Sequence, residues 1–139
     1  EVWEINPSTL KGDDLDKIVS SATYTVVQLY SPHCGFCKQA IPLNNALNES
    51  EHLNVLGLSG VDDLDSFKEH LNSKNIQYSF AIFVGQYTEQ ALLNAVNQHG
   101  FPTYFVLDSN KKVRGVFVGT PALKSWLKQS HPEYVDGLF

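Results

Sequence analysis

The chain of 139 residues contains no methionine and only two cysteines. With so few cysteines it cannot be a domain held together by several disulfides, and it cannot bind zinc through four thiolates. Charged residues are also scarce, at 18%, and the net charge is −5. Because 42% of the residues are hydrophobic, the composition predicts a folded chain with a sizeable core.

Basic residues are few and form no cluster. The 10 lysines and arginines are outnumbered by 15 acidic residues, which argues against binding to nucleic acid or to an anionic membrane. No apolar run approaches the roughly 20 residues of a membrane-spanning helix. We therefore expect no nucleic-acid partner and no membrane span in this chain. At this length, residues 1–139 are predicted to form a single domain.

The first residue is Glu1, and a methionine start is absent. This predicts a processed or excised chain, and removal of a signal peptide or membrane anchor is one way to produce it. Both cysteines lie in one motif, so no other thiol is open to oxidation in an oxidising compartment. We expect an extracytoplasmic location, in the periplasm or tethered to a membrane and facing outside, although a cytosolic protein can show the same economy.

Hydrophobic patterns along the chain predict strands that alternate with helices. The strand candidates are 24–30, 53–58, 78–84, 103–107 and 113–118, with helices near 15–21, 35–48, 62–71, 88–98 and 120–127. The first strand, the helix after it and the second strand form a βαβ unit, so the two strands should be parallel. The short connection between the last two strands predicts an antiparallel hairpin. Pro42 should kink its helix, and the tail 130–139 is expected to be loosely attached.

The two cysteines, Cys34 and Cys37, are separated by two residues at the junction of a predicted strand and helix. Free N–H groups at a helix N-terminus lower the pKa of a neighbouring thiol, and Lys38 adds positive charge. One helical turn brings Cys37 beside Cys34. The spacing predicts a dithiol for thiol–disulfide exchange, with Cys34 as the exposed nucleophile and Cys37 as the more buried resolving thiol.

The cysteine pair has two other interpretations, a structural disulfide and half of a metal site. An inert disulfide that closes so short a loop stabilises little. Zinc requires about four ligands, and the five histidines are scattered, so the pattern predicts no metal and no other cofactor. His33 directly precedes Cys34, where a protonated imidazole would stabilise the thiolate. An ordinary turn residue is an equal alternative for His33.

Over most of its length the chain resembles the thioredoxin superfamily. In those proteins a Cys-x-x-Cys follows a buried strand, a proline stands five residues after the second cysteine, and a cis-proline loop precedes a hairpin and a last helix. Pro42 and Gly100-Phe101-Pro102-Thr103 match these features. The segment 59–99 is similar to the insertion of the TlpA/ResA-like branch. The resemblance implies an α/β thioredoxin-like fold, a central mixed sheet flanked by helices with a helix-containing insertion before the cis-proline loop.

The resemblance also implies site residues beyond the cysteines. Pro102 corresponds to the cis-proline that faces the disulfide, and Phe101 before it would offer backbone hydrogen bonds to a substrate strand.

The chain departs from the superfamily pattern at three places. Gln28 stands where many members carry a buried acid, and an amide accepts no proton at neutral pH. His33 replaces an aromatic Trp. The dipeptide Gly35-Phe36 replaces one that often contains proline, and the bulky Phe36 is a candidate surface contact for a partner.

The function implied is that of a thiol–disulfide oxidoreductase, using Cys34-Gly35-Phe36-Cys37 on protein disulfides. The resemblance implies a reductant outside the cytoplasm, which an upstream donor would re-reduce; a membrane-bound electron carrier is one candidate for that donor. One alternative is a disulfide oxidase or isomerase with the same residues. Another is a non-catalytic module that binds a partner through the surface around Phe36 and Phe101. The direction of electron flow stays open because the intervening dipeptide influences the reduction potential.

Overall fold

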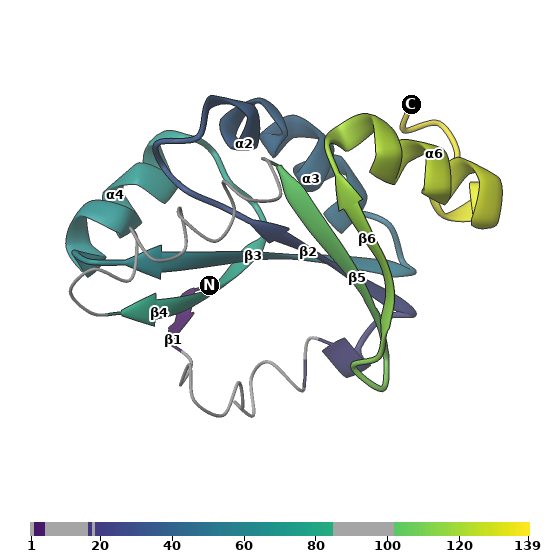
Figure 1. Cartoon of the computed structure of the whole chain (residues 1–139), viewed down its shortest axis with the longest axis horizontal. Coiled ribbons are helices and arrows are strands. Elements are labelled where there is room, and N and C mark those ends of the chain that lie inside the picture. Colours follow the sequence, from purple (N-terminus) through teal and green to yellow (C-terminus); the bar gives the residue numbers. More distant parts are fainter. Residues whose placement is uncertain (1, 5–16, 18, 85–101) are drawn as a thin grey trace.

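The computed structural model describes residues 2–4, 17, 19–84 and 102–139. Within these residues the strands form one sheet in the order β1-β4-β3-β2-β5-β6 (Figure 1). The strands are β1 (Val2–Glu4), β2 (Tyr24–Leu29), β3 (Leu53–Val61), β4 (Ser79–Val84), β5 (Thr103–Asp108) and β6 (Val113–Val118). The helices are α2 (Gly35–Gln39), α3 (Ile41–Asn48), α4 (Leu64–Ser73) and α6 (Thr120–Ser130), and η1 (Pro132–Tyr134) is a 3₁₀ turn.

Strand β2 lies in the middle of the sheet, and its end leads to the two cysteines. It pairs with β3 in parallel, where Val26 faces Val55, and with β5 in the antiparallel sense, where Val26 faces Val106. The predicted βαβ unit is therefore confirmed. An apolar strand with little alternation suits this position because both of its faces are buried.

Strand β3 is longer than the predicted segment 53–58 and ends at Val61. The segment from Ser59 to Val61 stays in the sheet because it pairs in parallel with Ile82 to Val84 of β4. The first residues of the segment 59–99 therefore belong to the sheet, and its correspondence to a family insertion stays a prediction. Strand β4, predicted as a strand or an extended segment, lies between β1 and β3. The helix predicted near 88–98 is outside the described residues.

The helix predicted over residues 35–48 is divided into α2 and α3 at Ala40. Pro42 stands in the first turn of α3. It has no N–H to donate to the carbonyl of Lys38, so a continuous helix would lose a hydrogen bond at this point. The predicted kink is thus found as a break, and it separates the short cysteine-bearing helix from the longer one behind it.

Helices α2, α3, α4 and α6 lie on one face of the sheet (Figure 1). The main core forms between them and the strands, and its members include Val26, Cys37, Leu47, Phe80 and Leu123. A smaller cluster of Val27, Leu56 and Ala81 lies on the opposite face. The helix predicted near 88–98 and residues 15, 16 and 18 of the one near 15–21 fall outside the described part of the chain, whereas residues 17, 19 and 20 are helical.

The hairpin of β5 and β6 is antiparallel, as predicted. Its turn is organised by Asp108, whose carboxylate accepts hydrogen bonds from the backbone N–H groups of Asn110 at 2.9 Å and Lys112 at 3.0 Å. Arg114 Nε donates to the same carboxylate at 2.9 Å. These contacts, the backbone bond from Lys112 foremost, hold the pKa of Asp108 below its ordinary value because they stabilise the charged form.

The C-terminal segment is packed against the domain, so the prediction of a loosely attached tail is wrong. Val135 is buried in the main core, and Phe139 packs against it. The Tyr134 ring is stacked between two imidazoles, with centroid distances of 4.7 Å to His131 and 4.4 Å to His52. The tail stays attached because its aromatic and apolar side chains contact residues that are distant in sequence.

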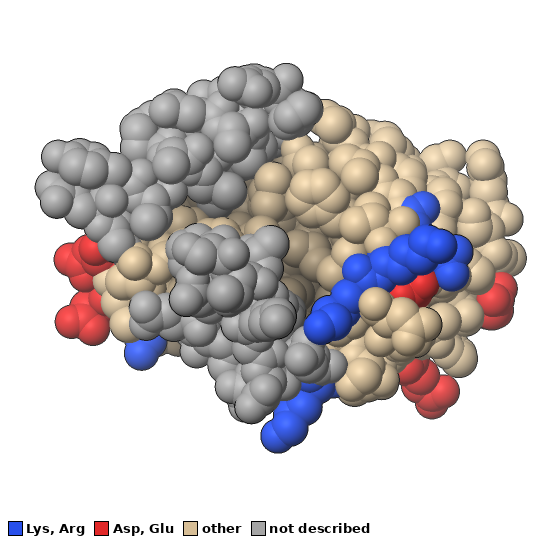
Figure 2. Space-filling model, turned by 60° about the horizontal axis from the view of Figure 1, so that its bottom comes forward, with Lys and Arg blue, Asp and Glu red and all other residues tan. Residues whose placement is uncertain are grey.

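Charge on the described surface is sparse. On the face shown in Figure 2, several lysine and arginine side chains form one short row with an acidic side chain set into it, and other basic side chains lie apart from this row. Much of the rest of that described surface is uncharged. Among the described helices, none is both long enough and apolar enough to cross a bilayer.

Candidate active site

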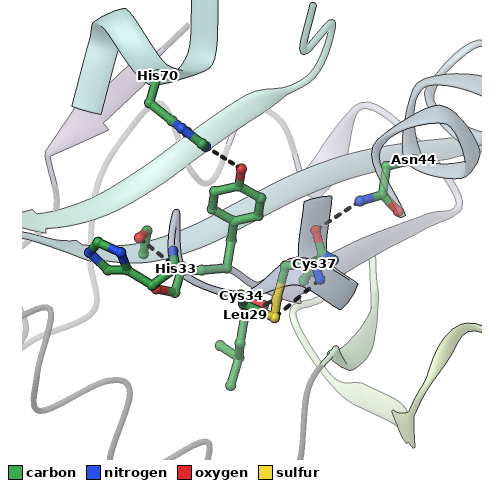
Figure 3. Close-up of a disulfide and its surroundings, with 10 residues drawn as sticks. Leu29, His33, Cys34, Cys37, Asn44 and His70 are labelled. Carbon is green, nitrogen blue, oxygen red and sulfur yellow. Dashed lines mark hydrogen bonds between the residues drawn. A yellow bond between two sulfur atoms is a disulfide. The ribbon is translucent and has the colours of Figure 1, made fainter. Parts of the chain in front are cut away.

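Cys34 and Cys37 are joined by a disulfide at the start of α2 (Figure 3). Cys34 is the N-cap residue of the helix, with an extended backbone. Its Sγ accepts a hydrogen bond from the backbone N–H of Cys37 at 3.1 Å. A hydrogen bond to this sulfur stabilises its thiolate, because it favours the charged form of the group. The first turn of α2 therefore places a backbone N–H donor at the Cys34 sulfur, as the sequence predicted from the two-residue spacing of the cysteines.

The two cysteines are both buried, with Cys34 7% exposed and Cys37 0% exposed. The prediction of an exposed Cys34 is therefore wrong, because the residue packs into the main core. Cys37 is the more buried of the two, which is the predicted order. The Sγ of Cys37 lies 3.7 Å from the carbonyl oxygen of Leu29. In the reduced form, this carbonyl is an acceptor within reach of the Cys37 thiol.

A buried polar network centred on Asn44 lies within the main core, to which its members Tyr78 and Tyr104 belong. Asn44 extends from α3, and its Nδ2 donates to Gln28 Oε1 at 2.8 Å (Figure 3) and to the Tyr78 hydroxyl at 3.2 Å. The Tyr104 hydroxyl donates to Asn44 Oδ1 at 3.1 Å. Gln28 Nε2 has no hydrogen-bond partner among the described residues. Burial raises the pKa of Tyr78 to about 12 and raises the pKa of Tyr104 further, so both stay neutral.

This network contains no carboxylate, so Gln28 lies in a neutral environment in which, among the described residues, its Oε1 is hydrogen-bonded and its Nε2 is not. Sequence reasoning singled out Gln28 and missed Asn44. A signal for Asn44 was present, because it falls three residues after Ile41 and three before Leu47 on the buried side of the helix. A polar residue at such a position usually has buried partners.

A second pair links the cysteine-bearing segment to helix α4. The hydroxyl of Tyr30, which directly follows β2, lies 2.5 Å from Nε2 of His70 (Figure 3). Burial lowers the pKa of His70, and the positive charges of Lys74, Lys38 and the imidazole of His33 lower it further. Burial also raises the pKa of Tyr30. Sequence reasoning missed this pair, since nothing local connects a strand end to a helix 40 residues later.

The other predicted site residues are placed as follows. His33 is exposed, and its backbone N–H donates to Ser31 Oγ at 3.2 Å. Lys38 stands in the last turn of α2. Pro102 is buried, and its carbonyl accepts from the N–H of Gly119 at 2.7 Å. Phe101, and with it the peptide bond predicted to be cis, lies outside the described residues.

Phe36 is 66% exposed, as a contact residue on the surface must be. It lines a groove of about 220 Å³ together with Pro102, and the opposite wall comes from the start of α6. The fold thus brings Phe36 of the Cys-x-x-Cys motif and Pro102 of the predicted proline loop to one concave surface. Among the residues the structure describes, no group of His, Cys, Asp and Glu could hold a metal ion.

Comparison with solved structures identifies the architecture. A thiol:disulfide interchange protein from Bacteroides sp. superimposes with a TM-score of 0.63 at 15% identity, covering 88% of this chain and 81% of that one. The thioredoxin domain of a thiol-disulfide oxidoreductase from Bacteroides vulgatus gives 0.59 at 12% identity, over 78% and 79% of the two chains. The chain has a thioredoxin-like fold. A thiol-disulfide oxidoreductase from Bacteroides fragilis gives 0.57 at 20% identity, over 76% and 80%.

No family model and no curated protein matches the sequence. At identities of 12–20% the structural likeness establishes the thioredoxin-like fold alone. The predicted fold class is thereby confirmed. The chemistry must be argued from the disulfide and its surroundings.

Proposed function

We propose that this thioredoxin-like chain is a thiol–disulfide oxidoreductase that exchanges electrons with protein disulfides through Cys34 and Cys37. The observation that carries the proposal is the disulfide at the start of α2, in which Cys34 is the less buried residue and Cys37 is fully buried. Two of the structural neighbours are described as a thiol-disulfide oxidoreductase and a thiol:disulfide interchange protein, which supports the same chemistry.

The reaction begins with the reduced protein. The thiolate of Cys34 attacks one sulfur of a substrate disulfide, a bond forms between them, and the second substrate sulfur leaves as a thiolate. Cys37 then loses its proton and attacks Cys34. The mixed disulfide breaks, and the first substrate sulfur also leaves as a thiolate. Two electrons have moved to the substrate, each departing thiolate takes up a proton, and the protein is left with its internal disulfide.

The proton of Cys37 has no acid–base partner in the buried network. Gln28 and Asn44 are amides, and the two tyrosines are kept neutral by burial. In this proposal the proton therefore passes to water or to the departing substrate thiolate. Leu29 O and the N–H of Cys37 act by orienting the two sulfurs.

We propose that electrons flow from the protein to its substrate, outside the cytoplasm, and that a separate donor reduces the Cys34–Cys37 disulfide again. Confinement of both cysteines to the motif supports the location. The reduction potential tests the direction. A value near that of thioredoxin, about −270 mV, supports a reductant, whereas one near about −120 mV would indicate an oxidase with the same residues.

Reduction of insulin by the dithiol form tests the activity itself. We expect the unaltered chain to reduce insulin, Cys34→Ser to be inactive, and Cys37→Ser to accumulate a covalent mixed disulfide that a thiol releases. The trapped species distinguishes exchange from simple binding, because a non-catalytic module would form none. Insulin reduction that survives Cys34→Ser would contradict the mechanism.

A further inference from the structure

A groove runs from the Cys-x-x-Cys motif to helix α6. Its apolar lining residues are Phe36, Ala40, Leu43 and Pro102, and its polar ones are Gln39 of α2 and Thr120 and Lys124 of α6. The volume of the groove, about 220 Å³, is large enough for one or two side chains but too small for a helix or a strand with its side chains. Its occupant is therefore a short segment of chain.

One end of this groove is tied to the disulfide by sequence and by backbone contacts. Phe36 is one of the two residues between the cysteines, and it directly precedes Cys37. On the other side, the hydrogen bond from Gly119 N–H to the Pro102 carbonyl, at 2.7 Å, fixes the proline loop to the residue before α6. Neither cysteine lines the groove, but Phe36, two residues after Cys34, does. Residues next to the reactive cysteine of a substrate bound at Cys34 are therefore the ones that could reach the groove.

The polar end carries a positive charge without a compensating carboxylate. Lys124 is half-buried, and among the described residues no acidic group lies within ion-pair distance of its Nζ. Its Nζ lies over the Phe139 ring, 5.5 Å from the ring centroid. Lys128, one turn further along α6, lies 5.2 Å from the same ring but does not line the groove.

We propose that the Phe36–Lys124 groove selects protein substrates that carry an apolar side chain and an acidic side chain next to the reactive cysteine. The apolar side chain packs between Phe36 and Leu43, where it removes the exposed ring from water. The carboxylate reaches Lys124, whose half-buried position strengthens the attraction relative to a pair in bulk water. This inference rests on the proposed exchange activity and adds the chemistry by which a substrate is recognised.

Peptide disulfides test the inference. Each peptide has one cysteine capped with 2-mercaptoethanol and flanked by Leu-Glu, Leu-Lys or Ser-Glu, with the pair placed before the cysteine in one set and after it in another. The reduced protein is mixed with each peptide, and the second-order rate of reduction is measured. Hydroxyethyl disulfide, which has neither side chain, reports basal exchange. In one of the two sets we expect Leu-Glu to react about fivefold faster than Leu-Lys at low salt, and the ratio to shrink in high salt.

Two substitutions in α6 form a matched pair. Lys124→Glu should reverse the preference between Leu-Glu and Leu-Lys, and Lys124→Gln should abolish it. Lys128→Glu changes the charge by the same amount one turn away, and it should leave the preference and the rate with hydroxyethyl disulfide unaltered. Phe36→Ala should remove the advantage of Leu-Glu over Ser-Glu.

The outcomes separate the two proposals. If hydroxyethyl disulfide is reduced but the Leu-Glu to Leu-Lys ratio is the same in the unaltered protein, Lys124→Glu and Lys124→Gln, the groove proposal is overturned and exchange stands. A preference that Lys128→Glu shifts as strongly as Lys124→Glu also overturns it, since the charge of the whole helix would then decide. If the unaltered dithiol protein reduces no disulfide at all, the proposed exchange activity fails.

Discussion

The hydroxyl of Tyr30 lies 2.5 Å from Nε2 of His70 and joins the end of β2 to helix α4. Tyr30 is fully buried, four residues before Cys34, and its carbonyl accepts from Ser59 Oγ at 2.8 Å. The segment that leads into the cysteines is thus held from two sides, by β3 and by α4. Because His70 belongs to the predicted insertion, the insertion supports the site through this contact.

The lowered pKa of His70 predicts a pH-dependent contribution to stability. Between that lowered pKa and the ordinary value of about 6.5, the unfolded chain binds a proton here more readily than the folded chain does. The free energy of unfolding should therefore fall as the pH decreases through this window. His70→Gln should show a shallower fall between pH 7 and pH 5, measured by urea denaturation. Parallel curves for the two proteins would contradict the prediction.

Replacing Asn44 by alanine should destabilise the fold by about 3 kcal/mol, because a buried group left without its partner costs about 1–3 kcal/mol. Asn44 contacts Gln28, Tyr78 and Tyr104, and all three would lose a hydrogen bond. Asn45→Ala is the matched control on the same helix. Its side chain bonds only the backbone of Asn75 and Gln77 in exposed positions, where water can replace it. Equal losses in the unfolding free energy would refute the role of the buried network.

Gln28→Glu would place a carboxyl group in the buried site. Burial penalises the charged form, so we expect its pKa to rise above the ordinary value of about 4.3. Above that value the unfolded chain releases the proton more readily, and stability relative to the unaltered protein should fall as the pH increases. The loss is about 1.4 kcal/mol for each unit of pKa difference. Urea denaturation from pH 4 to pH 8 measures it, and a constant difference over this range would argue against a desolvated carboxyl.

Gly57→Ala should destabilise the sheet by about 1–3 kcal/mol through overpacking. A Cβ at Gly57 would overlap the ring of Phe80, which is fully buried and cannot move aside. Gly35→Ala is the comparison, since a Cβ there meets nothing within 4 Å. In the first turn of α2 this change should be neutral or stabilise by up to about 1 kcal/mol. The thermal midpoints of the two variants should therefore shift in opposite directions or by clearly different amounts, and a loss at Gly35 as large as at Gly57 would count against steric overlap as the cause.

Local sequence patterns were sufficient for most of the strands and for the position of the cysteines. The apolar run 24–30 and the motif after it predicted a central strand followed by a helix N-terminus, because burial on both faces and the spacing of two cysteines are properties of a few consecutive residues. The hairpin followed for the same reason. Pro42 marked where the helix fails, since its missing N–H acts locally, although the sequence did not say whether a kink or a break would result.

What only the tertiary structure decided are contacts between elements. The pairing of Ser59–Val61 with β4, the packing of Val135 in the core and the meeting of Asn44 with Tyr78 and Tyr104 all join distant segments. The same holds for Tyr30 with His70, and for Phe36 with Lys124 across the groove. The sequence by itself determined that a dithiol stands at the start of a helix, because spacing and strand pattern are local. Which residues surround the dithiol was decided only by the tertiary structure, because hydrogen bonds and side-chain packing depend on distances in space.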